Sequence, residues 1–533
     1  MNRRLLPVSF PVRLLALAAL GGAASAQAPG QCPPVWTNLG FHEENVGSAL
    51  AADGTEAFFG HFAGFSVGVY QEQETEAWTR VDLIGTSGLV PSGFGNSVAL
   101  RGDTGLVGDS RDQTLVSSPF GSGQGAAVIF ERVGEQFEPV VNLLPNNPTL
   151  FHAFGVSVSL SHDEQWAAVG ASGQVSSAGA VYVYDRAASW ALDAELVPAA
   201  LQSNDNLGAS VAIGDDGWLF AGAPSSHVGT GMGRVYVFED TPGGWVERGT
   251  LEPAVAIGTY GFGARLDYEG GRLFVGSPNE SEFAGAVYVF EHDGVAWVQT
   301  DRITAETEEA TASFGRSLDA LGDHLAVGAG RKVFAYAFDG GDWLQYERID
   351  DPSDVTFSEY GSAVAWYDKG LLVGGWNHDD NGFDYPDDTG VVYSYDLTEV
   401  GQPLRACGHK VFLETPWVGN SERLLLNAPE RAGQAYILLG SLTGVGPFSL
   451  GVVDVPLTID AYFLYTLGHP GAPPLPGGLG VLDAEGRAEA DFTLPDGLSP
   501  DLAGLVTRHA FVTFTGGSNA TFASNPVTIA IEL

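Results

Sequence analysis

Short apolar runs alternate with tight turns rich in Gly and Asp over the first four hundred residues, and this pattern recurs seven times. Each unit has a Gly, a run of small apolar residues, a turn, and a second apolar run that ends in Gly. The units are anchored at Gly47, Gly95, Gly155, Gly208, Gly263, Gly315 and Gly361. A repeat of 46 to 60 residues that contains short strands is typical of a β-propeller.

The fifth unit shows how one repeat is built. Residues 262–268 alternate between apolar and polar positions, as in a half-buried strand, and a Gly-rich turn follows. Residues 273–278 predict a second strand, 285–290 a third, and Trp297 begins a fourth and more polar one. We therefore predict an all-β protein with a seven-bladed β-propeller, each blade having four strands.

The seventh unit has no fourth strand of its own in the sequence. After Leu397 the chain leaves the pattern, whereas residues 34–39 form a strand pattern without a blade. We predict that this N-terminal strand completes blade seven and closes the ring, which removes exposed sheet edges. Cys32 and Cys407 flank the two ends, so we predict a disulfide between them; the alternative is two unpaired thiols.

The chain begins with the features of a signal peptide. Arg3 and Arg4 precede a short apolar segment, residues 14–20, and a small-residue cleavage site ends at Ala26. We expect residues 1–26 to be removed and the mature protein to be secreted, periplasmic or exposed at the cell surface. The apolar segment is too short to span a membrane, and no later segment predicts membrane insertion.

The repeat pattern ends near residue 400, so we predict the propeller over residues 27–400 and a second domain over 404–533. Short apolar runs in the second domain alternate with turns rich in Gly and Pro, which predicts a small β-sandwich. The runs are residues 423–426, 435–439, 488–494, 510–514 and 527–531.

The composition limits the partners. The net charge is −41, and only three lysines are present, which argues against nucleic acid and anionic membranes. We expect a monomer whose partner is a protein or a glycan.

Residues 94–100 and 220–224 resemble the two halves of the FG-GAP motif, and residues 285–290 resemble the strand that follows it. The chain is thus similar, over about 36–397, to the FG-GAP repeat family of integrin α-subunit propellers, in a bacterial exported form. The resemblance implies a propeller and a binding or adhesion function. Many members carry a calcium loop between the first two strands of a blade. In this chain those turns are too short to hold calcium, so we do not expect the calcium sites of the family here.

One acidic loop is a candidate site. Residues 377–388, in the seventh unit, hold five Asp around an Asn-Gly turn. Hard oxygen ligands at such spacing suit calcium, the one candidate cofactor, with Asp379, Asn381 and Asp384 as ligands. Asp380, Asp387 and Asp388 are further candidates for binding. The alternative is a solvated acidic loop without a ligand.

No catalytic constellation is evident in the sequence. Residues 64–68 match G-x-S-x-G, but they fall on a predicted strand instead of a strand-to-helix turn. We therefore predict a non-enzymatic binding or adhesion protein. Two alternatives stay open: a carbohydrate-active hydrolase or lyase with paired carboxylates at the central channel, and a structural cell-surface protein.

Overall fold

The described residues of the computed structural model form two compact units, one within Trp36–Thr398 and the other within Glu399–Leu533. No helix in this described part is both long and apolar enough to cross a membrane. The structure describes residues 46–532 outside these gaps: 62–65, 73–77, 86–92, 113–122, 147–151, 174–176, 226–232, 256–260, 306–312, 339, 352–358, 379–388, 397–403, 407–409, 413–420, 429–430, 444–447, 451–452, 484–485, 495–505, 516–518 and 525–526.

The first unit is an array of antiparallel sheets, here called the sheet array (Val46–Asp396). In the described residues it contains six four-stranded sheets and one three-stranded sheet, each with its strands in chain order. The first strands are β1 (Val46–Asp53), β5 (Phe94–Arg101), β9 (Phe154–Leu160), β13 (Ser210–Ile213), β17 (Arg265–Glu269), β21 (Ser317–Leu321) and β25 (Tyr360–Tyr367). The second strands are β2 (Glu56–His61), β6 (Thr104–Asp109), β10 (Trp166–Ala171), β14 (Trp218–Ala223), β18 (Arg272–Ser277), β22 (His324–Ala329) and β26 (Gly370–His378).

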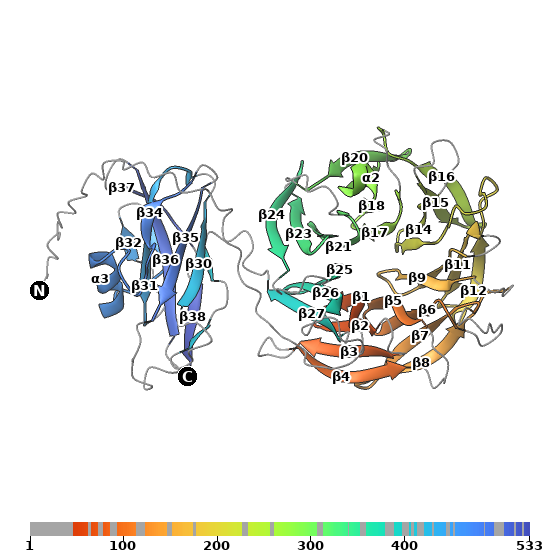
Figure 1. Cartoon of the computed structure of the whole chain (residues 1–533), viewed down its shortest axis with the longest axis horizontal. Coiled ribbons are helices and arrows are strands. Elements are labelled where there is room, and N and C mark those ends of the chain that lie inside the picture. Colours follow the sequence, from red (N-terminus) through yellow and green to blue (C-terminus); the bar gives the residue numbers. More distant parts are fainter. Residues whose placement is uncertain are drawn as a thin grey trace, which may run out of the picture. The chain divides into compact units, whose positions relative to one another are not determined.

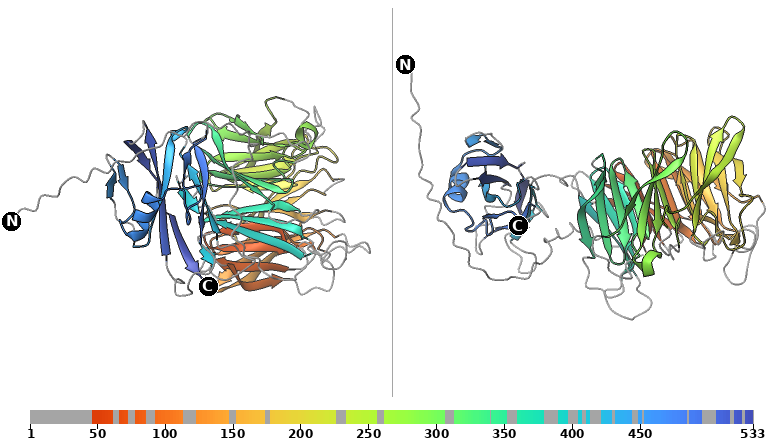
Figure 2. Two further views of the ribbon diagram at one scale, coloured as in Figure 1. Left: turned by 60° about the vertical axis from the view of Figure 1, so that its left-hand side comes forward. Right: turned by 90° about the horizontal axis from the view of Figure 1, so that it is seen from above.

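The remaining strands complete each sheet outward. The third strands are β3 (Ser66–Glu72), β7 (Ala126–Val133), β11 (Ala180–Asp185), β15 (Arg234–Thr241), β19 (Ala286–His292), β23 (Lys332–Phe338) and β27 (Thr389–Asp396). The fourth strands are β4 (Trp78–Gly85), β8 (Gln136–Leu143), β12 (Ala191–Leu196), β16 (Gly244–Leu251), β20 (Trp297–Ile303) and β24 (Trp343–Asp350). Figure 1 shows the first strands nearest the centre of the array and the fourth strands at its rim, which is a β-propeller-like arrangement. Figure 2 shows the same array from two further sides.

Glycine contacts join each sheet to the next. All seven anchor glycines have φ between +76° and +87°, a conformation that favours Gly. A Cβ built on the glycine of each second strand would lie 2.0–2.4 Å from the carbonyl oxygen of an anchor in the neighbouring sheet. The pairs are Gly60–Gly95, Gly108–Gly155, Gly170–Gly208, Gly222–Gly263, Gly276–Gly315, Gly328–Gly361 and Gly374–Gly47. The anchors found in the sequence therefore occupy equivalent positions, where backbone packs directly on backbone.

The aromatic residue at or beside the start of each fourth strand packs against the preceding sheet. The ring centroids of Phe137 and Phe58 are 4.9 Å apart, and those of Trp343 and Phe274 are 5.3 Å apart. Trp78 lies 5.2 Å from Tyr367 of the seventh sheet and donates a hydrogen bond to Ser394. Aromatic contacts between sheets thus supplement the glycine contacts.

Contacts also join the seventh sheet to the first. Ala365, Tyr367 and Leu372 share one buried cluster with Phe59 and Tyr70 of the first sheet. The seventh sheet has three described strands. Residues 34–39, predicted to supply its fourth strand, lie outside the described residues, as do Cys32 and Cys407.

The second unit has two main sheets that share one hydrophobic core, which includes Leu424, Leu438, Phe492, Phe511 and Ile529. One sheet consists of β28 (Leu404–Ala406), β30 (Ser421–Asn427) and β35 (Arg487–Thr493). The other consists of β29 (Lys410–Phe412), β38 (Val527–Glu532), β36 (Val506–Thr515), β31 (Ala435–Ser441), β34 (Leu479–Val481) and β37 (Asn519–Ala523). β32 (Phe448–Leu450) pairs with β33 (Val453–Val455). All five apolar runs noted in the sequence fall on strands, with the run 488–494 ending one residue beyond β35.

The second unit also contains a helix that the sequence analysis did not predict, α3 (Ala461–Gly468). Asp460 caps its N-terminus, because its side chain accepts a hydrogen bond from Phe463 N at 2.8 Å. The same carboxylate accepts from the backbone N–H groups of Leu442 (2.6 Å) and Thr443 (2.9 Å) and from the Ser441 hydroxyl (3.0 Å). Burial opposes ionisation, but these hydrogen bonds outweigh it and lower the pKa of Asp460 below its usual range.

Replacing Asp460 with Ala is expected to destabilise α3 and the adjacent turn by about 2 kcal/mol, because the cap and the charge-assisted bonds are lost together. Since the folded pKa is depressed, this stabilisation is present above the unfolded pKa and is lost as the pH falls through the folded pKa. Hydrogen exchange of peptides that cover α3, compared at pH 7 and pH 3, measures the difference. Asp460→Asn, which keeps one acceptor oxygen, serves as the control and is expected to lose less protection. Equal protection in wild type and Asp460→Ala at pH 7 would contradict the prediction.

Candidate functional site

Charged residues on the inner strands of the fifth and sixth sheets depart from the repeat. Four residues after each anchor, the other five sheets have Ala or Ser, but these two have Asp267 and Asp319. Two residues after the anchor, four sheets have Ser, whereas β17 has Arg265. Such departures from an otherwise consistent repeat are expected at functional sites, so these residues define the candidate site.

Each of the two aspartates binds the inner strand of the next sheet. Asp267 Oδ2 accepts a hydrogen bond at 2.7 Å from the backbone N–H of Ala320, the residue that follows Asp319. Asp319 Oδ2 in turn accepts from Trp366 N at 2.6 Å. Neighbouring inner strands do not pair with one another in the sheet order, and the carboxylates satisfy backbone donors that face across this gap. The two side chains therefore connect the fifth, sixth and seventh sheets.

The two aspartates also affect each other's ionisation. Burial and the negative charge of Asp267 raise the pKa of Asp319 to about 8. Burial likewise raises the pKa of Asp267, although the charge of Arg101 and the bond from Ala320 oppose this. The raised pKa of Asp319 favours its protonated form at neutral pH.

Further charged groups from distant sheets face this pair. Arg101, at the end of β5, is close enough that its positive charge opposes the raised pKa of both aspartates. His162 Nε2, just after β9, lies 2.9 Å from Glu269 Oε2 at the end of β17. Glu269 also accepts from Gly322 N at 3.1 Å. Groups from the second, third, fifth and sixth sheets thus meet near the centre of the sheet array.

Arg265 and Arg316 both lie near Gly276. A Cβ built on Gly276 would lie 3.2 Å from Arg265 Cβ. It would also lie 2.4 Å from the carbonyl oxygen of Gly315, the residue before Arg316. Arg316 forms an ion pair with Glu359, whereas Arg265 donates a hydrogen bond to the Ala264 carbonyl at 2.8 Å. The Arg265 side chain is exposed to solvent, yet desolvation and then the charge of Arg316 lower its pKa. A side chain that contacts water while protein surrounds it lies in a concave part of the surface.

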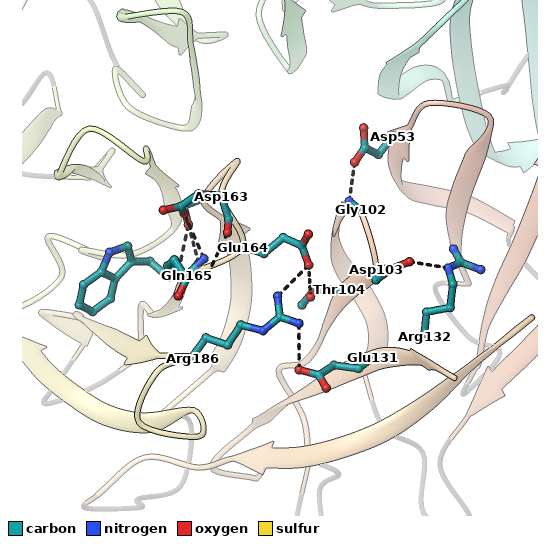
Figure 3. Close-up of polar contacts among 12 residues, drawn as sticks. Asp53, Gly102, Asp103, Thr104, Glu131, Arg132, Asp163, Glu164, Gln165 and Arg186 are labelled. Atoms are coloured by element: carbon teal, nitrogen blue, oxygen red, sulfur yellow. Dashed lines mark hydrogen bonds and ion pairs between the residues drawn. The ribbon is translucent and has the colours of Figure 1, made fainter. Parts of the chain in front are cut away.

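The hairpin turns between first and second strands use their acidic residues for contacts between sheets (Figure 3). Asp53 accepts from Gly102 N at 2.5 Å, and Asp103 pairs with Arg132 at 2.9 Å. Glu164 accepts from the Thr104 hydroxyl at 2.6 Å. It also pairs with Arg186 at 2.8 Å, and Arg186 reaches Glu131 at 3.3 Å. These short turns therefore link the first three sheets. No group of three or more His, Cys, Asp or Glu suited to a metal ion occurs in the part of the chain that the structure describes.

The candidate ligands predicted from the sequence cannot be placed. Asp379, Asp380, Asn381, Asp384, Asp387 and Asp388 all lie outside the described residues. Ser66 of the G-x-S-x-G match begins strand β3, in agreement with the expectation that this match is not a nucleophile turn. The sequence analysis missed Arg101, Arg265, Asp267 and Asp319. Aligning the seven units on their anchor glycines would have revealed three of these, because they stand where other units have small residues.

Comparison with known proteins does not assign a function. No protein-family model matches the chain, and no curated protein matches it. Among solved structures, the chain is similar to hydrazine synthase of Kuenenia stuttgartiensis, with 14% identity and a TM-score of 0.43 over 66% of this chain and 97% of that chain. It is also similar to a functionally unknown protein from Desulfotomaculum acetoxidans, with 11% identity and a TM-score of 0.39 over 62% of this chain and 96% of that chain. The fold described above rests on the order and pairing of the strands.

Proposed function

We propose that this protein is an exported, non-enzymatic binding or adhesion protein built on a closed seven-bladed propeller of the FG-GAP type. The repeated glycine contacts support the ring, since they run from each sheet to the next and from Gly374 back to Gly47. Residues 34–39 would complete the three-stranded seventh sheet, and a Cys32–Cys407 disulfide would hold the two ends together. Mass spectrometry of a non-reduced digest tests this disulfide, and two free thiols would argue against it.

The observation that carries the binding function is a scaffold held by direct backbone contacts. Because each sheet is antiparallel, the connections between second and third strands all leave from the same end of their sheets. Connections on such a scaffold commonly bind partners, since the scaffold fixes their positions. The partner is a protein or a glycan. The acidic loop with Asp379, Asn381 and Asp384 belongs to one such connection and would hold calcium, with Asp380, Asp387 and Asp388 beside it.

A thermal-shift screen of the full mature chain tests this function. A ligand that binds only the folded state raises the melting temperature, and the rise grows with the logarithm of its concentration relative to Kd. We expect a rise with calcium that is lost in Asp379→Asn/Asp384→Asn, and a rise with at least one glycan class. No shift with any glycan, protein candidate or metal would leave only the structural role.

The paired aspartates favour a second candidate, a carbohydrate-active hydrolase or lyase at the central channel. Two carboxyl groups with raised pKa values, that of Asp319 at about 8, would suit the general-acid role in glycoside cleavage. Release of reducing ends from polysaccharides by wild type, and its loss in Asp267→Asn and Asp319→Asn, would establish this activity. The aspartates already accept backbone hydrogen bonds from the next sheet, which instead supports a structural role for the pair.

A further inference from the structure

Serine hydroxyl groups join the inner strands of four sheets to the neighbouring sheets, whereas at the same position β1 and β25 have Ala and β17 has Arg265. Two residues after the anchor, the serine hydroxyl donates to the anchor carbonyl of the next sheet at 2.7–2.8 Å. The donors and acceptors are Ser97–Gly155, Ser157–Gly208, Ser210–Gly263 and Ser317–Gly361. In β17 the corresponding residue is Arg265, which pairs with Gly276 in the same register as these serines pair with their own second strands.

Arg265 is energetically unfavourable in this position. Its guanidinium is partly desolvated and lies near the like charge of Arg316, and the Gly315 carbonyl loses the serine donor present in four other sheets. Most other arginines of the described sheet array form ion pairs with carboxylates, for example Arg132, Arg272 and Arg302. No carboxylate within ion-pair distance of Arg265 is found among the described residues. An exposed guanidinium with donors to spare, beside a second one, is suited to bind an oxyanion.

The Asp267 carboxylate, farther along β17, indicates which class of ligand the site would bind. Asp267 is two residues from Arg265 and on the same side of β17, about 6.7 Å along the strand. Its two oxygens accept from Ala320 N and Tyr268 N, but each carboxylate oxygen has a second lone pair. Sugar hydroxyls are suitable donors for these lone pairs, and one sugar ring spans such a spacing.

We propose that the inner strands β17 and β21 bind an acidic sugar. Arg265, with Arg316 beside it, takes the sugar carboxylate, and Asp267 accepts from its hydroxyl groups. Because the chain has a net charge of −41, a ligand with one carboxylate is preferred to a polyanion, which the field of the protein repels. This inference deepens the proposed binding function and rests on it.

Titration of the full mature chain with glucuronate, followed by ligand-observed NMR, tests the proposal. Glucose is the control without the carboxylate, and acetate is the control without the sugar. We expect both to bind at least about tenfold more weakly than glucuronate. Glucose loses the charge-assisted contact with Arg265, and acetate loses the hydroxyl contacts with Asp267. Equal binding of glucose, or equal binding of acetate, overturns the proposal.

The matched variants are Arg265→Ser and Arg248→Ser. Arg265→Ser restores the serine found in four other sheets, so it is expected to fold with unchanged or higher stability and to lose glucuronate binding at least about tenfold. Arg248, on the rim strand β16, pairs with Glu239, and its replacement is expected to leave binding unchanged. Glucuronate binding by Arg265→Ser at wild-type affinity overturns the proposal, as does an Arg265→Ser variant that fails to fold, since Arg265 would then be structural.

Three further outcomes identify the source of the sugar and separate this inference from the function on which it rests. Tighter binding of an oligosaccharide ending in glucuronate than of free glucuronate identifies a polysaccharide end as the source of the sugar. If glucuronate does not bind but another glycan or a protein raises the melting temperature, the acidic-sugar site is wrong and the binding function stands. If polysaccharide is cleaved to reducing ends, the binding function itself is wrong.

Discussion

Replacing Gly222 with Ala is expected to destabilise the sheet array by roughly 3 kcal/mol or more. The added Cβ would lie 2.0 Å from the Gly263 carbonyl oxygen and 2.3 Å from the Ser210 hydroxyl oxygen. Backbone cannot move aside as a flexible side chain can, so the fourth and fifth sheets must separate. The Ser210–Gly263 hydrogen bond, 2.7 Å long, would be lost as well. Urea unfolding followed by tryptophan fluorescence gives the change in free energy of unfolding.

Gly243→Ala, in the turn between β15 and β16 of the same blade, is the matched control. A Cβ at Gly243 meets only the Thr241 hydroxyl oxygen within 4 Å, at 3.7 Å, so we expect a change within about 0.5 kcal/mol. Neither glycine requires a positive φ, and the comparison therefore isolates the contact between sheets. If both variants unfold at the same urea concentration as wild type, the glycine contacts do not hold the array together.

Replacing Asp319 with Asn is expected to raise the free energy of unfolding at pH 8.5 by about 2 kcal/mol and to change it little at pH 5. The value is kept small because the Asp319 side chain is partly exposed, so solvent weakens the effect of its raised pKa. Burial and the charge of Asp267 raise the pKa of Asp319 to about 8 in the folded state. The folded state then binds more protons than the unfolded state between about pH 4 and pH 8, so wild-type stability falls as the pH rises through this window. Asn keeps an oxygen acceptor for Trp366 N and carries no charge.

Urea unfolding of wild type and Asp319→Asn at several pH values between 5 and 8.5 measures this effect. Asp267→Asn is the companion variant, because it removes the neighbouring charge and is expected to move the pH window of Asp319 downward. A constant difference between wild type and Asp319→Asn across the whole range would mean that the pKa of Asp319 is not raised in the folded state.

The strands of the sheet array were predictable because their signals are local. In the fifth unit, apolar alternation and Gly turns predicted strands near 273–278 and 285–290, and the structure has β18 at Arg272–Ser277 and β19 at Ala286–His292. α3 was missed because it has only eight residues and its pattern is mostly apolar and aromatic. The Asp460 cap was a local signal that would have suggested it.

The candidate site was less predictable. Arg265, Asp267 and Asp319 were visible as departures from the repeat, but nothing in the sequence indicated which distant groups they meet. Arg101 lies three repeats before Asp267 in the chain, and His162 meets Glu269 from two sheets away. The partners of the turn residues, such as Arg186 for Glu164, likewise depend on how neighbouring sheets pack.

Local patterns in the chain thus establish the repeat, the strands within each unit and the glycine positions, because turn geometry and alternation act over a few neighbouring residues. Which charges come together near the centre, and how their pKa values shift, depends on the packing of sheets formed by residues far apart in the chain. That packing sets burial and the separation of charges, and neither is encoded in any single stretch of sequence.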